Sequence, residues 1–150
     1  MAESLSGRRL VIFRRTAGDQ PTDAADLYIA DTLGELGLFF RVARLVVMGG
    51  SFVAGIGGHN PLEPARVGAA VISGRAVFNF ERTYEDMWRA RAALPAEGED
   101  DLAELMANML AHPERAREMG LRAKAYCERG DKALKTAWGA LQPLLPDRAA

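Results

Sequence analysis

The sequence predicts an α/β fold, in which a parallel sheet carries helices on its faces and is followed by C-terminal helices. Two observations lead to this prediction. Over the first two thirds of the 150 residues, short apolar runs alternate with amphipathic stretches, as is typical of a parallel sheet covered by helices. Beyond Pro95 the apolar residues recur at helical spacing. We expect residues 1–96 to form the sheet-bearing region and residues 97–150 the helical part of the same domain.

Each apolar run of the first region is short enough to be a buried strand, and the stretches between the runs have helical periodicity. The expected strands cover residues 10–13, 26–30, 45–48 and 69–72. The expected helices cover residues 33–43, 61–67 and 80–92. Asp31 and Thr32 would cap the first of these helices, and Gly68 would end the second.

Three helical segments are expected after Pro95. A stripe of leucine and methionine at i, i+3, i+4, i+7 and i+8 predicts an amphipathic helix over residues 100–111. Pro113 starts a second helix that lasts to about Glu128, and the pair Gly130-Asp131 is expected to break it. The last apolar face consists of Leu134, Trp138, Leu141 and Leu145. We interpret the methionines and Trp138 as core residues and assign them no role in binding.

Composition and charge exclude several classes of protein. The net charge of −1, from 19 basic and 20 acidic residues, does not favour a nucleic-acid groove or a polybasic membrane surface. The single Cys127 excludes an internal disulfide and a cysteine-built metal site, and we interpret it as a partly buried helical thiol. No apolar run approaches the roughly 20 residues of a membrane span, and the first residues lack the apolar region of a secretory signal. A cytoplasmic location is therefore expected.

The stretch from Gly57 to Pro64, Gly-Gly-His-Asn-Pro-Leu-Glu-Pro, is the most informative in the chain. Its two glycines let the backbone approach a ligand, Asn60 is a strong N-cap, and Pro61 is favoured at the first helical position. Such a helix start suits an anion such as phosphate. The carboxylate of Glu63 can accept hydrogen bonds from sugar hydroxyls, as acidic residues do in dinucleotide-binding folds. The alternative interpretation is a well-capped surface helix after a flexible loop.

Three glycine-bearing loops follow three of the expected strands. The first contains Gly34 and Glu35, the second runs from Gly49 to Asn60, and the third from Gly74 to Asn79. In an open parallel sheet, ligands bind beyond the carboxyl ends of the strands. The sequence therefore predicts a nucleotide-sized cleft at this edge, with the helix after Asn60 supplying the anion site. Three independent tight turns are the alternative.

The residues of these loops resemble a known family. The segments DTLGELGL (31–38), GGS (49–51), GGHNPLEP (57–64) and NF (79–80) occur in the order and near-spacing of the bacterial 3-deoxy-D-manno-octulosonic acid (Kdo) transferases, which make the inner core of lipopolysaccharide. The resemblance runs from about Arg14 to about Leu145 and matches the later part of the family's C-terminal domain. It implies the GT-B glycosyltransferase fold, of which this chain would supply an incomplete doubly wound, Rossmann-like sheet with C-terminal helices.

The resemblance also implies roles toward the activated donor, CMP-Kdo. The turn expected to contact the cytidine part, largely through its backbone, consists of Leu33, Gly34 and Glu35. The corner expected to hold the ribose and phosphate, with the acidic residue on the ribose hydroxyls, consists of Asn60, Pro61, Leu62 and Glu63. The residues expected to line the cleft are Gly49, Gly50, Ser51, Gly58, His59 and Asn79.

Three side chains near this site have open interpretations. His59 could polarise the phosphate or the sugar, or make a purely structural hydrogen bond. Arg14 and Arg15 could approach the phosphate or form a solvated strand end. The chain also departs from the family in two places: the loop 50–58 is one residue longer than usual, and Arg75-Ala76 stands where the family tends to place Pro-His.

The resemblance places the general base of the reaction on a carboxylate of the family's N-terminal domain. We therefore expect no catalytic residue in this chain and no Kdo transfer to a lipid A precursor by the chain alone. The full-length family is expected at the cytoplasmic face of the bacterial inner membrane. No cofactor is implied, and no metal is expected, because no cluster of His, Asp and Glu has ligand spacing.

Several alternatives stay open from the sequence. The chain could be a fragment, a degenerate copy, or a domain that pairs with a second copy or a complementing chain, since exposed strand edges favour association. Its function could be that of a Kdo transferase donor domain or of a noncatalytic nucleotide-binding or assembly module. Another GT-B enzyme with a different nucleotide sugar is disfavoured by the pairing of DTLGEL with GGHNPLEP.

Overall fold

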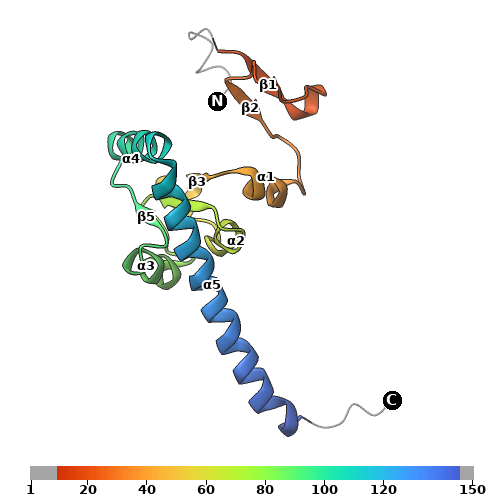
Figure 1. Cartoon of the computed structure of the whole chain (residues 1–150), viewed down its shortest axis with the longest axis vertical. Coiled ribbons are helices and arrows are strands. Elements are labelled where there is room, and N and C mark those ends of the chain that lie inside the picture. The colour runs from red at the N-terminus through yellow and green to blue at the C-terminus, as the bar shows by residue number, and fades with distance from the viewer. Residues whose placement is uncertain (1–9, 146–150) are drawn as a thin grey trace. The chain divides into compact units, whose positions relative to one another are not determined.

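The computed structural model describes residues 10–145 of the chain (Figure 1). These residues divide into two compact units, 10–36 and 37–145, which we describe separately. The strands likewise form two sheets, one of two strands and one of three, rather than the single sheet that was expected.

The first unit is built around two parallel strands. Strand β1 (Ile12–Arg14) is followed by a short 3-10 helix, η2 (Arg15–Ala17), and pairs with β2 (Leu27–Ile29). Side-chain carboxylates close the connections, because Asp26 accepts a hydrogen bond of 2.8 Å from the Val11 amide and Asp19 accepts one of 2.8 Å from the Arg14 amide. The unit is therefore held by local hydrogen bonds, and its strands are only partly buried.

The second unit contains the three-stranded sheet, in the order β3-β4-β5 with all strands parallel. Strand β3 (Leu45–Met48) pairs along its length with β4 (Ala70–Ser73), and β4 pairs with the two-residue β5 (Leu94–Pro95). All four residues of β4 are buried, as expected of a central parallel strand covered on both faces.

Helices of very different length surround this sheet. They are α1 (Leu36–Val42), η3 (Gly49–Phe52), α2 (Leu62–Arg66), α3 (Glu81–Arg89), α4 (Glu99–Ala111), α5 (Pro113–Leu141) and η4 (Gln142–Leu144). The 29-residue α5 crosses the sheet and contacts α2, α4 and β4 (Figure 1). The close approach depends on Gly120, since a Cβ there would overlap the carbonyl oxygen of Gly68.

The α/β fold class predicted from the sequence is confirmed, and the strands at 45–48 and near 70 lie where the apolar runs place them. The helix after Asp31 begins later than expected, at Leu36, because Gly34 adopts a left-handed φ of 87°. Strand β5 was not predicted, since two residues carry no periodicity. The expected division at residues 96 and 97 stays a prediction.

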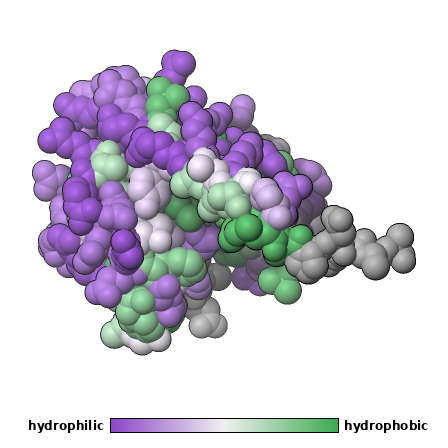
Figure 2. Space-filling model, turned by 90° about the horizontal axis from the view of Figure 1, so that it is seen from below, coloured by the Kyte–Doolittle hydropathy of each residue, from purple (hydrophilic) through white to green (hydrophobic). Residues whose placement is uncertain are grey.

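Two expectations for the C-terminal region were wrong. Helix α5 continues through Gly130 instead of breaking there, because a single exposed glycine costs a helix only about 1 kcal/mol and its neighbours are good helix formers. Trp138 is not a core residue, since its side chain is 56% exposed, and Leu134 beside it is 70% exposed. Figure 2 looks at this end of the molecule and shows apolar side chains gathered there.

Candidate functional site

The loops after β3 and β4 meet at the carboxyl edge of the sheet and are tied together by Ser51. Its buried hydroxyl donates a hydrogen bond of 2.5 Å to the Met48 carbonyl and accepts one of 2.6 Å from the Gly74 amide. Its backbone carbonyl accepts a further bond of 3.0 Å from the Ala76 amide. One small polar side chain thus fixes the ends of two adjacent strands relative to each other.

Glycines allow this contact between the loops. A Cβ at Gly74 would overlap the Ser51 carbonyl oxygen, so only glycine fits where the second loop passes the first. A Cβ at Gly50 would lie 2.8 Å from Nε2 of His59, which shows that the imidazole lies over this part of the backbone. Gly49 is exposed and has open space around it. The predicted cleft residues Gly50, Ser51 and His59 are therefore neighbours.

The segment that leads into α3 supports the Gly57-Gly58 turn. Both glycines have left-handed φ values, 79° and 76°. The Asn79 side-chain amide donates a hydrogen bond of 2.8 Å to the Ile56 carbonyl, and its backbone amide donates one of 3.0 Å to the Gly57 carbonyl. Asn79 therefore shapes the glycine turn by direct hydrogen bonds.

Tyr84 supports the same turn from the core. Its fully buried side chain donates a hydrogen bond of 2.8 Å from the phenol to the His59 carbonyl. Burial raises the pKa of Tyr84 to about 12, so the phenol is a neutral hydrogen-bond donor at neutral pH. Tyr84 was not predicted as a site residue from the sequence, although the apolar spacing of α3 could have placed it on the buried face of that helix.

The corner after the turn has the cap that the sequence predicts. Oδ1 of Asn60 accepts a hydrogen bond of 3.0 Å from the Leu62 amide, and Pro61 is buried with a helical φ of −75°. Helix α2 has only five residues, so its dipole is small. Glu63 lies in its first turn, is exposed, and forms no hydrogen bond or ion pair with residues 10–145.

At this corner, the backbone amides without an acceptor among the described residues lie just before α2 and at Glu63 in its first turn; of these residues, Gly57 and Gly58 are buried, and His59 and Glu63 are exposed. Pro61 and Pro64 have no N–H group, and the Leu62 amide already donates to Asn60. Within the described part of the chain, the amides of residues 57–60 donate to no protein acceptor. An anion bound at this corner would therefore contact the Gly-Gly-His-Asn tip, with Glu63 beside it.

The turn at Leu33, Gly34 and Glu35 belongs to the first unit. The carboxylate of Glu35 accepts hydrogen bonds of 3.1 and 2.7 Å from Nε and Nη2 of Arg15, and one from the Thr32 hydroxyl. These bonds, that from Arg15 first, hold the pKa of Glu35 below its usual value. Leu33 is fully exposed. With the Glu35 side chain occupied, this turn offers a ligand its backbone and the exposed Leu33.

Both arginines of β1 and η2 are paired with acidic residues of the first unit. Thr16 donates to Asp31 from its hydroxyl at 2.7 Å and from its amide at 3.0 Å, and Arg14 Nε lies 3.6 Å from the same carboxylate. The hydroxyl hydrogen bond is the main reason why the pKa of Asp31 is lowered. Arg14 and Arg15 therefore position the turn at residues 31–35, a role that neither sequence interpretation included.

Arg75, at the position where the chain departs from the family, links the loops after β4 and β5. Its Nε donates a hydrogen bond of 3.0 Å to Glu97, and its guanidinium lies 5.0 Å from the centre of the Trp88 ring. Trp88 in turn donates from Nε1 to the buried hydroxyl of Ser73 at 3.2 Å. Arg75 is thus engaged in structural contacts at the rim of the candidate site.

Residues 10–145 contain no group of three or more His, Cys, Asp or Glu side chains that could hold a metal ion. Within the same range, no helix is long and apolar enough to cross a membrane.

Comparison with known proteins identifies what this arrangement resembles. No protein-family model matches the sequence. The 3-deoxy-D-manno-octulosonic acid transferase of Bordetella pertussis is 33% identical over 145 residues, which is 96% of this chain, and that of Haemophilus influenzae is 30% identical over 97% of it. This chain is a homologue of the Kdo transferases. It spans about one third of the length of these relatives, 34% and 32% respectively.

A solved structure shows the same fold. The C-terminal CMP-Kdo binding domain of WaaA from Acinetobacter baumannii matches with a TM-score of 0.75 and 28% sequence identity, over 81% of this chain and 63% of that domain. The similarity confirms the α/β fold of a GT-B C-terminal domain that the sequence resemblance implied.

Proposed function

We propose that the chain binds the donor CMP-Kdo and supplies the donor-binding part of an enzyme that transfers Kdo to a lipid A precursor in lipopolysaccharide synthesis. The observation that carries the proposal is the Gly-Gly-His-Asn tip, whose amides have no acceptor within residues 10–145 and which adjoins the exposed Glu63. The similarity to a CMP-Kdo binding domain supports the same donor.

Each part of the donor has a proposed contact. The phosphate accepts hydrogen bonds from the amides of residues 57–60, and Glu63 accepts hydrogen bonds from the ribose hydroxyls. Gly49 and His59 are exposed and are proposed to contact the donor. The buried Gly50, Ser51 and Gly58, with the hydrogen bonds of Asn79, shape the loops that carry these contacts. For the turn at Leu33, Gly34 and Glu35, which belongs to the first unit, the family resemblance alone implies a backbone contact with the cytidine; the Glu35 side chain is paired with Arg15.

The same amides would stabilise the leaving group. Transfer breaks the bond between the Kdo anomeric carbon and a phosphate oxygen, and the electron pair stays on the phosphate of CMP while the sugar becomes cationic. Fixed N–H donors that face the developing charge lower the barrier without rearranging during the reaction. The hydrogen bonds from Asn79 and Tyr84 hold the backbone in this arrangement.

The acceptor hydroxyl must also lose a proton to a general base, and we propose that this base lies outside these 150 residues. The resemblance to the Kdo transferases supports this, because it places the base on a carboxylate of the family's N-terminal domain. The chain alone should then transfer no Kdo to a lipid A precursor, whether in solution or at the cytoplasmic face of the inner membrane, where we expect the full-length enzyme to act. Kdo transfer by the isolated chain would contradict this.

Ligand-induced thermal stabilisation tests donor binding. A ligand that binds only the folded state raises its stability by mass action, so CMP should raise the unfolding midpoint more than CDP, UMP or ADP. Glu63→Ala should weaken CMP binding about tenfold or more, since hydrogen bonds to charged groups contribute about 1.5–3 kcal/mol. Glu104→Ala, which removes an equally exposed carboxylate on α4, is the matched control and should bind CMP like the parent chain.

A noncatalytic nucleotide-binding or assembly module is the second candidate, supported by the edge position of β3 in the three-stranded sheet of the described residues. This function predicts association with a second copy or a complementing chain. Stabilisation by CMP together with concentration-dependent dimerisation favours the noncatalytic module. Stabilisation by none of the four nucleotides rejects the donor-binding proposal.

A further inference from the structure

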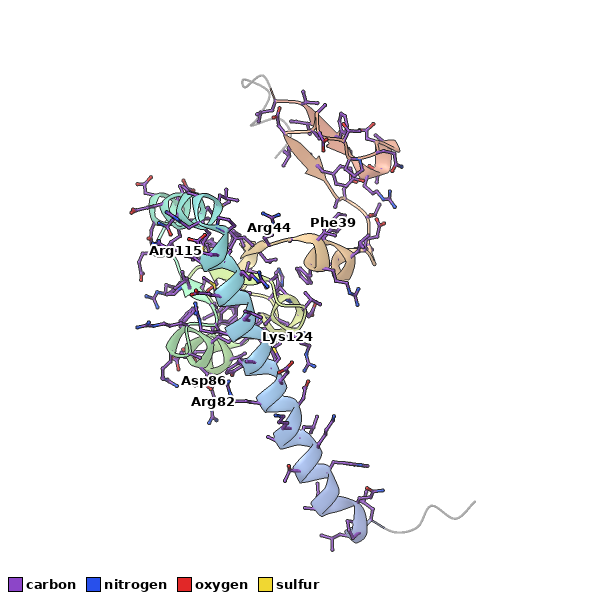
Figure 3. The ribbon with its side chains drawn as sticks, in the orientation of Figure 1. Phe39, Arg44, Arg82, Asp86, Arg115 and Lys124 are labelled. Atoms are coloured by element: carbon purple, nitrogen blue, oxygen red, sulfur yellow. The ribbon has the colours of Figure 1, made fainter. Side chains whose placement is uncertain are left out.

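Phe78, in the loop after β4, is an exposed aromatic side chain at the candidate site to which the donor contacts above assign no role. Its side chain is 61% exposed, whereas its neighbours Val77 and Phe80 belong to the hydrophobic core or pack against it. In the helix that follows, α3, charged residues such as Arg82 and Asp86 lie on the face turned away from the sheet (Figure 3). The exposed phenyl ring is therefore an exception in this part of the chain, and it lies beside the donor loops.

The Phe78 ring lies against the first residue of the Gly-Gly-His-Asn tip. A Cβ at Gly57 would come within 2.5 Å of the ring atoms Cε2 and Cζ, so only glycine fits beneath the ring. A turn holds the ring there, because the Phe80 amide donates a hydrogen bond of 2.8 Å to the Val77 carbonyl and the Asn79 amide donates one of 3.0 Å to the Gly57 carbonyl. The position of the ring is thus fixed by the fold before a ligand binds.

Ile56 extends this apolar surface on the other side of the glycine turn. Its side chain is 43% exposed, and its carbonyl accepts a hydrogen bond of 2.8 Å from the side-chain amide of Asn79. We call the side chains of Ile56 and Phe78 the apolar platform. They come from two loops and flank Gly57, the first residue of a tip whose amides have no acceptor within residues 10–145. Apolar side chains around a few well-placed polar groups are the usual composition of a small-molecule site.

The order of groups along the tip indicates which part of the donor would reach the platform. The inference rests on the proposed function, in which the phosphate lies on the amides of residues 57–60 and the ribose at Glu63. In a nucleotide sugar, the ribose and the transferred sugar are attached on opposite sides of the phosphate. With the ribose beyond residue 60, the transferred sugar is left on the side of Gly57, against which the Phe78 ring lies.

We propose that the apolar platform binds the sugar of the donor and makes the chain prefer a CMP-linked sugar to free CMP. A sugar ring is amphipathic, because its hydroxyls project from the rim while C–H groups cover much of its faces. Kdo lacks the hydroxyl at carbon 3 and so has a CH₂ group that an apolar surface can cover. An aromatic ring buries such a face, and its negative π face attracts the slightly positive C–H hydrogens.

Isothermal titration of the 150-residue chain with CMP and with CMP-Kdo separates the sugar from the nucleotide. The parent should bind CMP-Kdo more tightly than CMP. Phe78→Ala should weaken CMP-Kdo binding about five- to tenfold, as expected for the loss of one apolar ring face, and should change CMP binding by less than about twofold. Phe78→Tyr keeps the ring and places its hydroxyl in solvent, so it should retain the affinity for CMP-Kdo.

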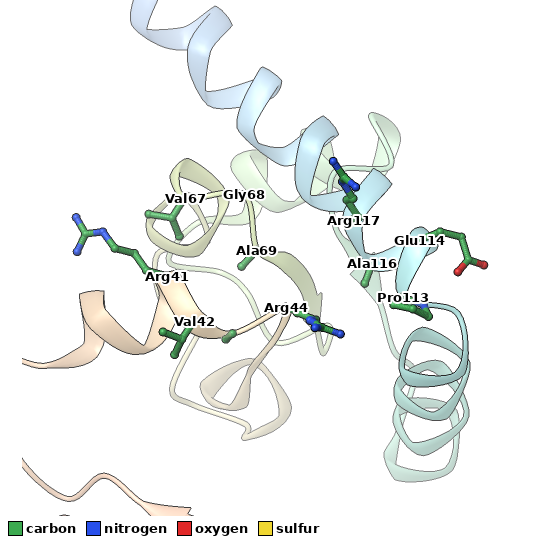
Figure 4. A pocket seen from close by; sticks show the side chains of 11 residues that line it. Arg41, Val42, Arg44, Val67, Gly68, Ala69, Pro113, Glu114, Ala116 and Arg117 are labelled. Atoms are coloured by element: carbon green, nitrogen blue, oxygen red, sulfur yellow. The ribbon is translucent and has the colours of Figure 1, made fainter. Parts of the chain in front are cut away.

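The matched control is Val42→Ala. It removes an apolar side chain that is 71% exposed and lies at the opposite, amino edge of the sheet, where it lines a cavity of about 580 Å³ (Figure 4). This variant should bind both ligands as the parent does. Thermal unfolding without ligand shows that each variant is folded.

The possible failures have different signatures. A parent chain that binds neither CMP nor CMP-Kdo would reject the donor-binding proposal and this inference with it. If the parent binds both ligands equally, or if Phe78→Ala leaves CMP-Kdo binding unchanged, the platform does not contact the sugar, while the donor-binding proposal stands. Equal weakening of CMP and CMP-Kdo in Phe78→Ala would assign the ring to the nucleotide or to support of the tip, and would likewise overturn the inference.

Discussion

Ser51→Ala is the substitution with the most clearly defined consequence at the candidate site. It removes the hydroxyl that donates to Met48 and accepts from the Gly74 amide, and it leaves that buried N–H without a partner. Each hydrogen bond contributes about 1 kcal/mol net, and an unsatisfied buried donor costs about 1–3 kcal/mol. We expect the free energy of unfolding to fall by about 2–4 kcal/mol, or a midpoint lower by about 5–12 °C for a chain of this size.

Urea denaturation followed by circular dichroism measures this change, with an unchanged m value showing that the denatured state is the same. The control is Thr136→Ala on α5, whose exposed hydroxyl donates to the Lys132 carbonyl at 3.0 Å. It should alter stability by no more than about 0.5 kcal/mol. The Ser51 variant should also bind CMP more weakly, because the two loops are no longer tied. If Ser51→Ala proves as stable as the control, the assigned role of the hydroxyl is incorrect.

Two further predictions concern α5 and the first unit. Gly120→Ala should destabilise the fold by about 1–3 kcal/mol in urea denaturation, because its Cβ overlaps the Gly68 carbonyl oxygen. Gly130→Ala, in open space on the same helix, should stabilise by up to about 1 kcal/mol, and the opposite order would contradict the packing. Arg15→Gln should raise the pKa of Glu35, measured by carboxyl NMR, toward its ordinary value of 4.5. Since that pKa is lowered in the folded state, its stabilising contribution is present above pH 4.5 and is lost as the pH falls through the folded value; an unchanged pKa in the variant would contradict the pairing.

The sequence predicted the fold class because its buried strands are continuous apolar runs and its loops contain glycine. The run 45–48 became β3 with the expected bounds, and the hydrogen bond from the Leu62 amide to Asn60 follows from local sequence preference. These features depend on residues near one another in the chain. They need no knowledge of the tertiary arrangement.

The features that the sequence did not reveal depend on contacts between distant residues. Ser51 meets Gly74 only because β3 and β4 pair in one particular register, and Arg15 meets Glu35 across 20 positions. The exposure of Trp138 depends on where α5 leaves the sheet, since its apolar spacing alone is that of a core helix. Roles that depend on such contacts become visible only in three dimensions.

A crystal structure of the chain soaked with CMP tests the central claim most directly. The account predicts phosphate density against the amides of residues 57–60, within hydrogen-bond distance of their N–H groups, and ribose hydroxyls at the carboxylate of Glu63. Well-ordered CMP bound anywhere else, or no nucleotide density at a concentration that saturates the thermal response, would contradict it.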